Sequence, residues 1–349
     1  MRGRSLSVIS RSIDNYVTGV SERSQQRGGL KDEGYITHDI FDDNMNSTTT
    51  SSQIQAWLES LRPKTLPLAI AAIMTGSALA SWSGHFSWSV ALLAFLTASL
   101  LQILSNLAND YGDVTKGSDT EQRIGPKRGM QKGLITAQQM KTALKITVLL
   151  SCLSGIALIT AACQSTSDII GFLGLGLLAI IAAITYTVGA KPYGYMGLGD
   201  LSVLIFFGWL SVLGTYYLQA HTFSLSTVLP ATACGLLSVA VLNINNLRDI
   251  ETDSQNGKNT LAVRLGGTKA RYYHAALLAG AMFCFIAFTL LYLNNWYSWL
   301  FLLASPMLLK HVLQVLRDPT AEGMRPQLVQ MVKVALLTNI LFSIGLILN

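Results

Sequence analysis

Long apolar segments recur from about residue 66 to the end of the chain, separated by short polar loops. Nine can be counted, at 66–83, 88–107, 142–163, 169–189, 198–218, 227–246, 274–293, 297–315 and 331–348. An α-helix needs about 20 apolar residues to cross the hydrocarbon core of a bilayer. The alternation of apolar and polar residues that is typical of membrane β-strands is absent. The pattern therefore predicts an all-α integral membrane protein with nine transmembrane helices.

The N-terminal stretch has a different composition. Residues 1–53 are rich in Ser, Thr, Asp and Arg and contain few large apolar side chains. Such a segment buries too little apolar surface to compensate for the entropy of ordering it. We therefore expect a disordered extension at 1–53 and a nine-helix transmembrane domain at 54–349. Met45 stands shortly before an amphipathic approach to the first apolar segment, and we expect it to be the natural start of translation.

The distribution of positive charge predicts the orientation in the membrane, because cytoplasmic loops collect Lys and Arg. All 25 Lys and Arg lie on the side of the N-terminal segment or near helix ends that face it. The loops near Gly84, Ser165, His221 and Asn294, on the other side, carry none. The N-terminus is therefore expected in the cytoplasm and the C-terminus outside. The net charge of +6 reflects this topology, so membrane lipid is an expected partner and nucleic acid is not.

Glycines within the spans, among them Gly76, Gly174, Gly176 and Gly235, are predicted to let helices approach closely. His274 lies at a span end with no partner at metal-ligand spacing. An interfacial position is expected for it.

Two groups of Asn and Asp residues stand at the ends of the second and sixth apolar segments. The first comprises Asn106, Asn109, Asp110 and Asp113, and the second comprises Asn245, Asn246, Asp249 and Asp253. Three members of each group are spaced so that they share one face of a helix. Both groups are predicted on the cytoplasmic side, and four spans separate them, as in an internal repeat.

Carboxylates at membrane depth are costly and are usually retained for a function. A bound divalent cation relieves the repulsion between them. Mg²⁺ prefers oxygen ligands and is often held by one or two carboxylates together with the phosphates of a substrate. One Asp at a helix end is more often a solvated carboxylate near lipid headgroups, but two matching groups favour a metal site. The sequence therefore predicts Mg²⁺ as a cofactor that bridges a diphosphate between the two groups.

Basic residues near the two groups suit a diphosphate leaving group, because cations neutralise the charge that develops on it. The allylic carbocation left behind needs a dry, apolar pocket, which a helix bundle supplies. The candidates are Lys116, Arg123, Lys127, Arg128, Lys132, Lys191 and Lys258. Some of these serve only the charge asymmetry of the loops. Arg62 and Lys64, before the first span, are expected to reach lipid headgroups, with contact to the carboxylate of an acceptor as the alternative.

The sequence around these residues resembles the UbiA superfamily of intramembrane aromatic prenyltransferases, whose members carry an Asn/Asp-rich motif after the second helix and another after the sixth. The similar segments are 58–67, 106–113, 116–119, 123–133, 191–195, 245–253 and 257–261. They extend from about residue 55 to the end of the chain. Within the superfamily they are most similar to the branch that acts in menaquinone biosynthesis.

The resemblance implies nine transmembrane helices around a central cavity in the bacterial cytoplasmic membrane, with the active site on the cytoplasmic side. It implies transfer of a polyprenyl group from a polyprenyl diphosphate to 1,4-dihydroxy-2-naphthoate, with loss of diphosphate and carbon dioxide. By the same resemblance, Asp110, Asp113, Asp249 and Asp253 are catalytic and hold Mg²⁺ together with Asn106 and Asn246. Substrate contacts are implied for Asn106, Asn109, Lys116, Arg128, Tyr186, Lys191, Asn245, Asn246 and Lys258.

Two features depart from the superfamily pattern. Relatives often show Tyr and Lys four residues apart after the fourth helix, whereas Tyr186 and Lys191 are five apart. Asp119 stands six residues beyond Asp113, which is not a helical repeat. We therefore expect Asp119 on a loop that caps the site rather than among the metal ligands.

Two other functions fit part of the pattern. A sister enzyme with another acceptor, such as 4-hydroxybenzoate or haem, shares the acidic motifs, and only the segment 123–133 argues against it. A secondary transporter also uses internal repeats and intramembrane carboxylates. Transporter sites, however, lie near the bilayer midplane on broken helices, whereas the acidic residues of this chain lie at one face of the membrane.

Overall fold

The computed structural model describes residues 42–117 and 127–349, so Asp119 and Arg123 lie outside the described residues. The chain divides into two compact units, residues 1–46 and 47–349, and the second is described below. The domain boundary predicted between residues 53 and 54 falls inside helix α1 (Asp42–Leu61). Disorder was predicted for residues 1–53, of which residues 1–41 lie outside the described residues and residues 42–53 belong to helix α1. The role of Met45 stays a prediction.

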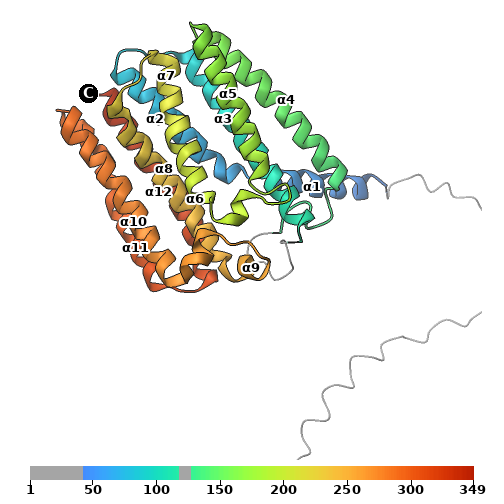
Figure 1. Cartoon of the computed structure of the whole chain (residues 1–349). Helices are drawn as coiled ribbons and strands as arrows, with labels where there is room; N and C mark the ends of the chain where they lie inside the picture. Colours follow the sequence, from blue (N-terminus) through green and yellow to red (C-terminus); the bar gives the residue numbers. More distant parts are fainter. Residues whose placement is uncertain (1–41, 118–126) are drawn as a thin grey trace, which may run out of the picture. The chain divides into compact units, whose positions relative to one another are not determined.

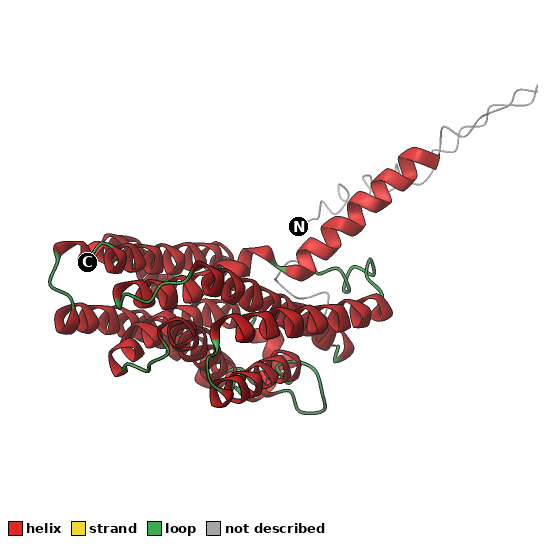
Figure 2. Cartoon of the chain, turned by 90° about the horizontal axis from the view of Figure 1, so that it is seen from above, coloured by secondary structure: helices red, strands yellow, loops and turns green. Residues whose placement is uncertain are grey.

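Nine helical spans long and apolar enough to cross a membrane are present in the described residues, as predicted. Figure 2 shows helices and connecting loops, with no strand among the described parts. The helices that follow α1 are α2 (Leu66–Trp82), α3 (Trp88–Thr115), α4 (Ala137–Ala162), α5 (Thr166–Thr185), α6 (Gly199–Val203), α7 (Gly214–Ala220), α8 (Val228–Arg248), α9 (Ile250–Gln255), α10 (Leu261–Tyr292), α11 (Ser305–Arg317) and α12 (Ala321–Ile347). The π-helical segment η3 (Leu204–Leu213) joins α6 and α7 into one span. The 3₁₀ segment η5 (Trp296–Ala304) leads into α11.

Threonine caps begin several of the spans. The Thr136 side chain accepts a hydrogen bond from the backbone N–H of Gln139, whose own side chain accepts from the Thr136 N–H, which makes a capping box for α4. Thr260 and Thr320 cap α10 and α12 in the same way, through one backbone N–H each. These side chains satisfy backbone donors that have no partner inside the helix.

Small residues bring some helices close together. A Cβ atom at Gly76 would lie 2.6 Å from the carbonyl oxygen of Val212, and one at Gly235 would lie 2.7 Å from Leu204 Cδ1. The predicted close approach is therefore confirmed at these two glycines. It is wrong for Gly174 and Gly176, because no atom would lie within 4 Å of a Cβ there. Both belong to α5, which has one buried residue and exposes most of its others.

The loops of the bundle lie at two opposite ends (Figure 1). The C-terminus lies at one end, where the side-chain amide of Asn295 donates to the backbone oxygen of Asn349 over 3.3 Å. Helix α9 and the loop that leads into α10 lie at the other end. The ends of α3 and α8, which carry the Asn/Asp groups, face the α9 end.

The interfacial position expected for His274 is wrong. His274 is fully buried, and its Nε2 lies 3.0 Å from Nε2 of His311 on α11. His311 Nδ1 lies 2.8 Å from Oε1 of Gln327 on α12. The sequence did not reveal this contact because the three residues are far apart along the chain and meet only when α10, α11 and α12 pack together.

Candidate active site

A cavity of about 720 Å³ lies inside the bundle. Apolar side chains such as Leu101, Leu158 and Phe172 line most of its length. Amide side chains from the ends of α3 and α8, among them Asn109 and Asn245, line one end. Ligand cavities commonly have this size, with apolar walls and a few polar groups that fix orientation. The shape suits a hydrocarbon chain that carries a charged head.

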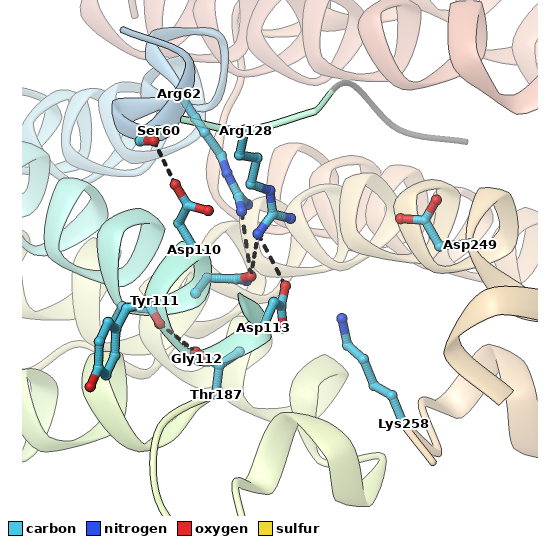
Figure 3. Close-up of polar contacts among 12 residues, drawn as sticks. Ser60, Arg62, Asp110, Tyr111, Gly112, Asp113, Arg128, Thr187, Asp249 and Lys258 are labelled. Carbon is cyan, nitrogen blue, oxygen red and sulfur yellow. Dashed lines mark hydrogen bonds and ion pairs between the residues drawn. The ribbon is translucent and has the colours of Figure 1, made fainter. Parts of the chain in front are cut away.

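The last turns of α3 carry the first Asn/Asp group. Asn106, Asp110 and Asp113 are all buried. Asp110 Oδ2 accepts a hydrogen bond of 2.5 Å from Ser60 Oγ on α1, and Asn106 Nδ2 donates to the backbone oxygen of Leu61 over 2.9 Å. The group therefore holds the end of α1 against α3 (Figure 3).

Asp113 is held from two sides. Its Oδ2 accepts from Arg128 Nη1 over 3.0 Å, and its Oδ1 accepts from the hydroxyl of Tyr195 over 2.9 Å. The preceding residue, Gly112, packs against the chain after α5, since a Cβ there would lie 2.7 Å from the backbone oxygen of Thr187. Any larger residue would push α3 away from the loop that supplies Tyr195.

The second group spans a break in the helix. Helix α8 ends at Arg248, α9 begins at Ile250, and Asp249 lies between them with φ −100° and ψ 11°. The backbone N–H of Asp249 still donates to Asn245 O over 3.2 Å, and that of Asp253 donates to Asp249 O over 2.8 Å. The helical spacing predicted from the sequence is therefore kept across the break.

Basic side chains bind the carboxylates of the second group. Arg248 donates to both oxygens of Asp249, over 2.7 and 2.6 Å, and to Asn245 Oδ1 over 2.9 Å. Lys258 Nζ lies 3.6 Å from Asp253 Oδ1. Arg248 and both carboxylates are buried.

Tyr195 connects the two groups. Besides its bond to Asp113, its ring lies under the ammonium groups of Lys116 and Lys258, at 5.6 and 5.5 Å from the ring centroid. Cations at this distance from an aromatic face are attracted to it. Because Lys258 also pairs with Asp253, a continuous chain of contacts runs from the first group to the second. The two groups therefore converge, as the sequence predicted, through a residue whose role it did not reveal.

Tyr186 lies at the polar end of the cavity. Burial first, and then the nearby carboxylate of Asp200, raise the pKa of Tyr186 well above its ordinary value. Burial also raises the pKa of Tyr193. Both effects disfavour the charged phenolate. The raised pKa of Tyr186 therefore favours the uncharged side chain.

Most of the predicted substrate-binding residues line the cavity. They are Asn106, Asn109, Arg128, Tyr186, Asn245, Asn246 and Lys258. Lys191 is exposed and lies outside the cavity lining, and Lys116 is exposed above Tyr195. The four aspartates are buried beside the lining and are not part of it.

Arg62 and Lys64 line the cavity, so the structure favours their alternative role over contact with headgroups alone. Arg62 adopts a left-handed backbone conformation, with φ 52°, directly before Pro63. Its Nη2 donates to Asn109 Oδ1 over 3.4 Å. After this bend, the guanidinium contacts the first Asn/Asp group.

Asp200 is a buried carboxylate that the sequence analysis did not select. It lies at the start of the fifth span with 6% of its surface exposed, and the polar side chain beside it is that of Tyr273 on α10. An intramembrane carboxylate is itself a signal of function. Asp200 was overlooked because it stands alone, without the repeated spacing of the two Asn/Asp groups.

The oxygen donors at the polar end suit Mg²⁺. Across residues 42–117 and 127–349, no three His, Cys, Asp or Glu side chains by themselves surround a position for a metal ion. Mg²⁺ does not require this, because it often takes one or two carboxylates and completes its shell with water and substrate phosphates. Carboxylate and amide oxygens from two helix ends are present for that purpose.

Fold and site together define an intramembrane helical protein with an internal cavity that is apolar along most of its lining and polar at one end. Amide and basic side chains gather at that end, and the four buried aspartates lie outside the lining. The family described as the UbiA prenyltransferase family matches residues 69–335. The chain belongs to this family.

Two curated relatives match this chain over almost the whole of their own length. The 1,4-dihydroxy-2-naphthoate octaprenyltransferase of Escherichia coli (strain K12) is 64% identical over 298 residues, which are 85% of this chain and 97% of that protein. The protein of the same name from Haemophilus influenzae (strain ATCC 51907 / DSM 11121 / KW20 / Rd) is 56% identical over 301 residues, 86% of this chain and 98% of that protein.

A solved structure described as a UbiA homolog from Archaeoglobus fulgidus bound to GPP and Mg²⁺ matches with a TM-score of 0.57. It is 16% identical and covers 84% of this chain and 100% of that chain. At this identity the likeness establishes the fold alone. The predicted family and the all-α fold with nine membrane spans are thus confirmed, and family membership decides against the secondary transporter.

Proposed function

We propose that the chain transfers a polyprenyl group from a polyprenyl diphosphate to 1,4-dihydroxy-2-naphthoate, releasing diphosphate and carbon dioxide. The observation that carries this proposal is the identity of 64% and 56% to two naphthoate octaprenyltransferases over nearly their full lengths. The apolar cavity with a charged end supports it, because the donor has a long hydrocarbon tail and an anionic head.

The two Asn/Asp groups bind the diphosphate through Mg²⁺ in this proposal. Asn106, Asp110 and Asp113 hold one edge, and Asn246, Asp249 and Asp253 hold the other. When bound, Mg²⁺ neutralises charge that develops on the departing diphosphate. Arg128 and Lys258 line the same end of the cavity and contact the diphosphate oxygens directly.

The apolar walls protect the reaction from water. When the bond between the allylic carbon and the diphosphate oxygen breaks, its electron pair leaves with the diphosphate. The allylic cation stays in the apolar part of the cavity, where water would otherwise capture it. A ring carbon of the naphthoate then forms the new carbon–carbon bond, and the ring carboxyl group leaves as carbon dioxide. Arg62 and Lys64 line the cavity, which supports the proposal that they pair with that carboxylate before it leaves.

The site faces the cytoplasm in this proposal, in a bacterial cytoplasmic membrane with the N-terminus inside and the C-terminus outside. The absence of Lys and Arg from the loops near Gly84, Ser165, His221 and Asn294 supports this orientation. Both Asn/Asp groups lie at the end of the bundle opposite Asn349.

The test is an assay of the purified protein with a polyprenyl diphosphate and three acceptors offered separately: 1,4-dihydroxy-2-naphthoate, 4-hydroxybenzoate and haem. We expect product from the naphthoate alone, with a mass equal to acceptor plus prenyl group less carbon dioxide. Chelation of divalent metal should stop the reaction, and added Mg²⁺ should restore it. Product from 4-hydroxybenzoate or haem, and none from the naphthoate, would assign the chain to a sister enzyme.

A further inference from the structure

Arg248 binds the carboxylate oxygens of Asp249, which are the atoms that a metal ion would use. Its Nε and Nη2 donate to the two carboxylate oxygens over 2.7 and 2.6 Å. This paired geometry is the strongest that Arg and a carboxylate form. Both side chains are about 95% buried, so solvent screens the contact little. The sequence analysis gave Arg248 no role.

Two other carboxylates of the groups, Asp113 and Asp253, are also paired with basic side chains. Arg128 Nη1 binds Asp113 Oδ2 at 3.0 Å and also Asn109 Oδ1 at 3.1 Å. Lys258 lies against Asp253. Arg128 and Lys258 line the cavity, whereas the four aspartates of the two groups do not. The carboxylates of Asp113 and Asp253 are therefore each paired with a basic residue that lines the cavity.

A metal ion that uses the same lone pairs of Asp249 as Arg248 must displace the guanidinium. The displaced Arg248 would then be a buried cation without its partner, which is strongly unfavourable. A diphosphate changes this balance, because its oxygens offer the guanidinium a new paired anion. Mg²⁺ and diphosphate should therefore bind together more favourably than the sum of their separate affinities.

We propose that Arg248 is a resident counter-ion of the metal site, which holds Asp249 until Mg²⁺ and diphosphate arrive together and then transfers to the diphosphate. Arg128 has the same relation to Asp113. The proposal rests on the metal-dependent function given above. It predicts that the metal site stays largely closed to free Mg²⁺ and opens when the donor head is present. Since coupling is reciprocal, each ligand raises the affinity of the other by the same factor.

The experiment measures Mn²⁺ binding to the purified full-length protein by electron paramagnetic resonance, at matched free Mn²⁺, with and without inorganic diphosphate. For the unsubstituted protein we expect diphosphate to tighten Mn²⁺ binding about tenfold or more, within the usual range of such coupling. In Arg248→Gln, Mn²⁺ alone should bind about tenfold more tightly than in the unsubstituted protein. The gain from diphosphate should shrink by a similar factor.

Two further variants complete the design. Arg248→Lys keeps the charge but loses the paired geometry, so it should also bind Mn²⁺ alone more tightly than the unsubstituted protein, by a smaller factor. It serves as the test if Arg248→Gln does not fold. Lys145→Gln removes one exposed positive charge on α4, away from the cavity lining, and should leave both Mn²⁺ affinities unchanged.

Two results would contradict these expectations, and each has a different meaning. If Arg248→Gln and Arg248→Lys bind Mn²⁺ alone with unchanged or weaker affinity, Arg248 orients Asp249 for the metal and does not compete with it, and the proposal is wrong. If the unsubstituted protein binds no Mn²⁺ even with diphosphate present, the metal-dependent function itself fails. Mn²⁺ binding to the unsubstituted protein therefore distinguishes failure of the Arg248 proposal from failure of the metal-dependent function.

Discussion

At the scale of single residues, Tyr195 has the most consequential position. Its hydroxyl donates to Asp113, and its ring lies under the ammonium groups of Lys116 and Lys258. One side chain therefore fixes a carboxylate of the first group and a cation that pairs with the second. The hydroxyl and the ring are separable by substitution, because Phe keeps the ring and loses the hydrogen bond.

We expect Tyr195→Phe to lower kcat/KM for the polyprenyl diphosphate about tenfold or more. A hydrogen bond to a charged group contributes about 1.5–3 kcal/mol, and about 1.4 kcal/mol corresponds to a factor of ten. Steady-state kinetics measure the effect. Tyr272→Phe is the matched control, because Tyr272 is exposed and lies outside the cavity lining. Equal kinetics for the two variants would show that the Asp113 contact does not support turnover.

The candidate residues that the sequence revealed share a repeated pattern. Asp110 and Asp249 were found because each stands at a span end with partners at helical spacing, and that spacing is set by local geometry alone. Arg248 and Tyr195 were not assigned roles, because their roles depend on side-chain contacts that the sequence does not show. A position next to Asp249 does not reveal whether an arginine turns toward that carboxylate or toward a lipid headgroup.

At the scale of helices, the buried histidine pair joins the last three spans. Gln327 Oε1 can only accept, so His311 Nδ1 carries the hydrogen that it donates. In a neutral imidazole the Nε2 of His311 is then the acceptor, and His274 Nε2 donates to it. Gln327 Nε2 in turn donates to Gln314 Oε1 over 3.3 Å. This directed series of hydrogen bonds fixes α10, α11 and α12 relative to one another.

We expect His274→Leu to destabilise the protein by about 1–3 kcal/mol, because it leaves the buried Nε2 of His311 without its donor. Thermal unfolding in detergent measures this as a lower midpoint. His85→Gln, at an exposed position in the loop after α2, should leave the midpoint unchanged. An unchanged midpoint for His274→Leu would mean that the bond contributes nothing to holding these helices together.

The helices themselves were largely predictable. Apolar length alone identified all nine spans, because a segment that crosses a bilayer must satisfy its backbone internally. The break at Asp249 and the loose packing of α5 were not predictable. Both features depend on which other segments pack against the helix. In the sequence, Gly174 and Gly176 cannot be distinguished from Gly76 and Gly235, which are closely packed.

At the scale of the whole transmembrane unit, the central claim is that two helix ends far apart in the sequence form one binding site. The contacts from Asp113 through Tyr195 and Lys258 to Asp253 support it, as does the single cavity that both ends line. This convergence is what allows one diphosphate to be held from two sides at the head of an apolar cavity.

A double-mutant cycle on Mg²⁺-dependent binding of inorganic diphosphate tests this claim most directly. Asp110→Asn and Asp249→Asn keep side-chain size and remove one negative charge each. If the two aspartates serve one bound ligand, each substitution should weaken binding about tenfold or more, and the double variant should lose less than the sum of the two. Departure from the sum by more than about 0.5 kcal/mol indicates coupling. Losses that add within that margin, or a loss from only one of the substitutions, would contradict a shared site.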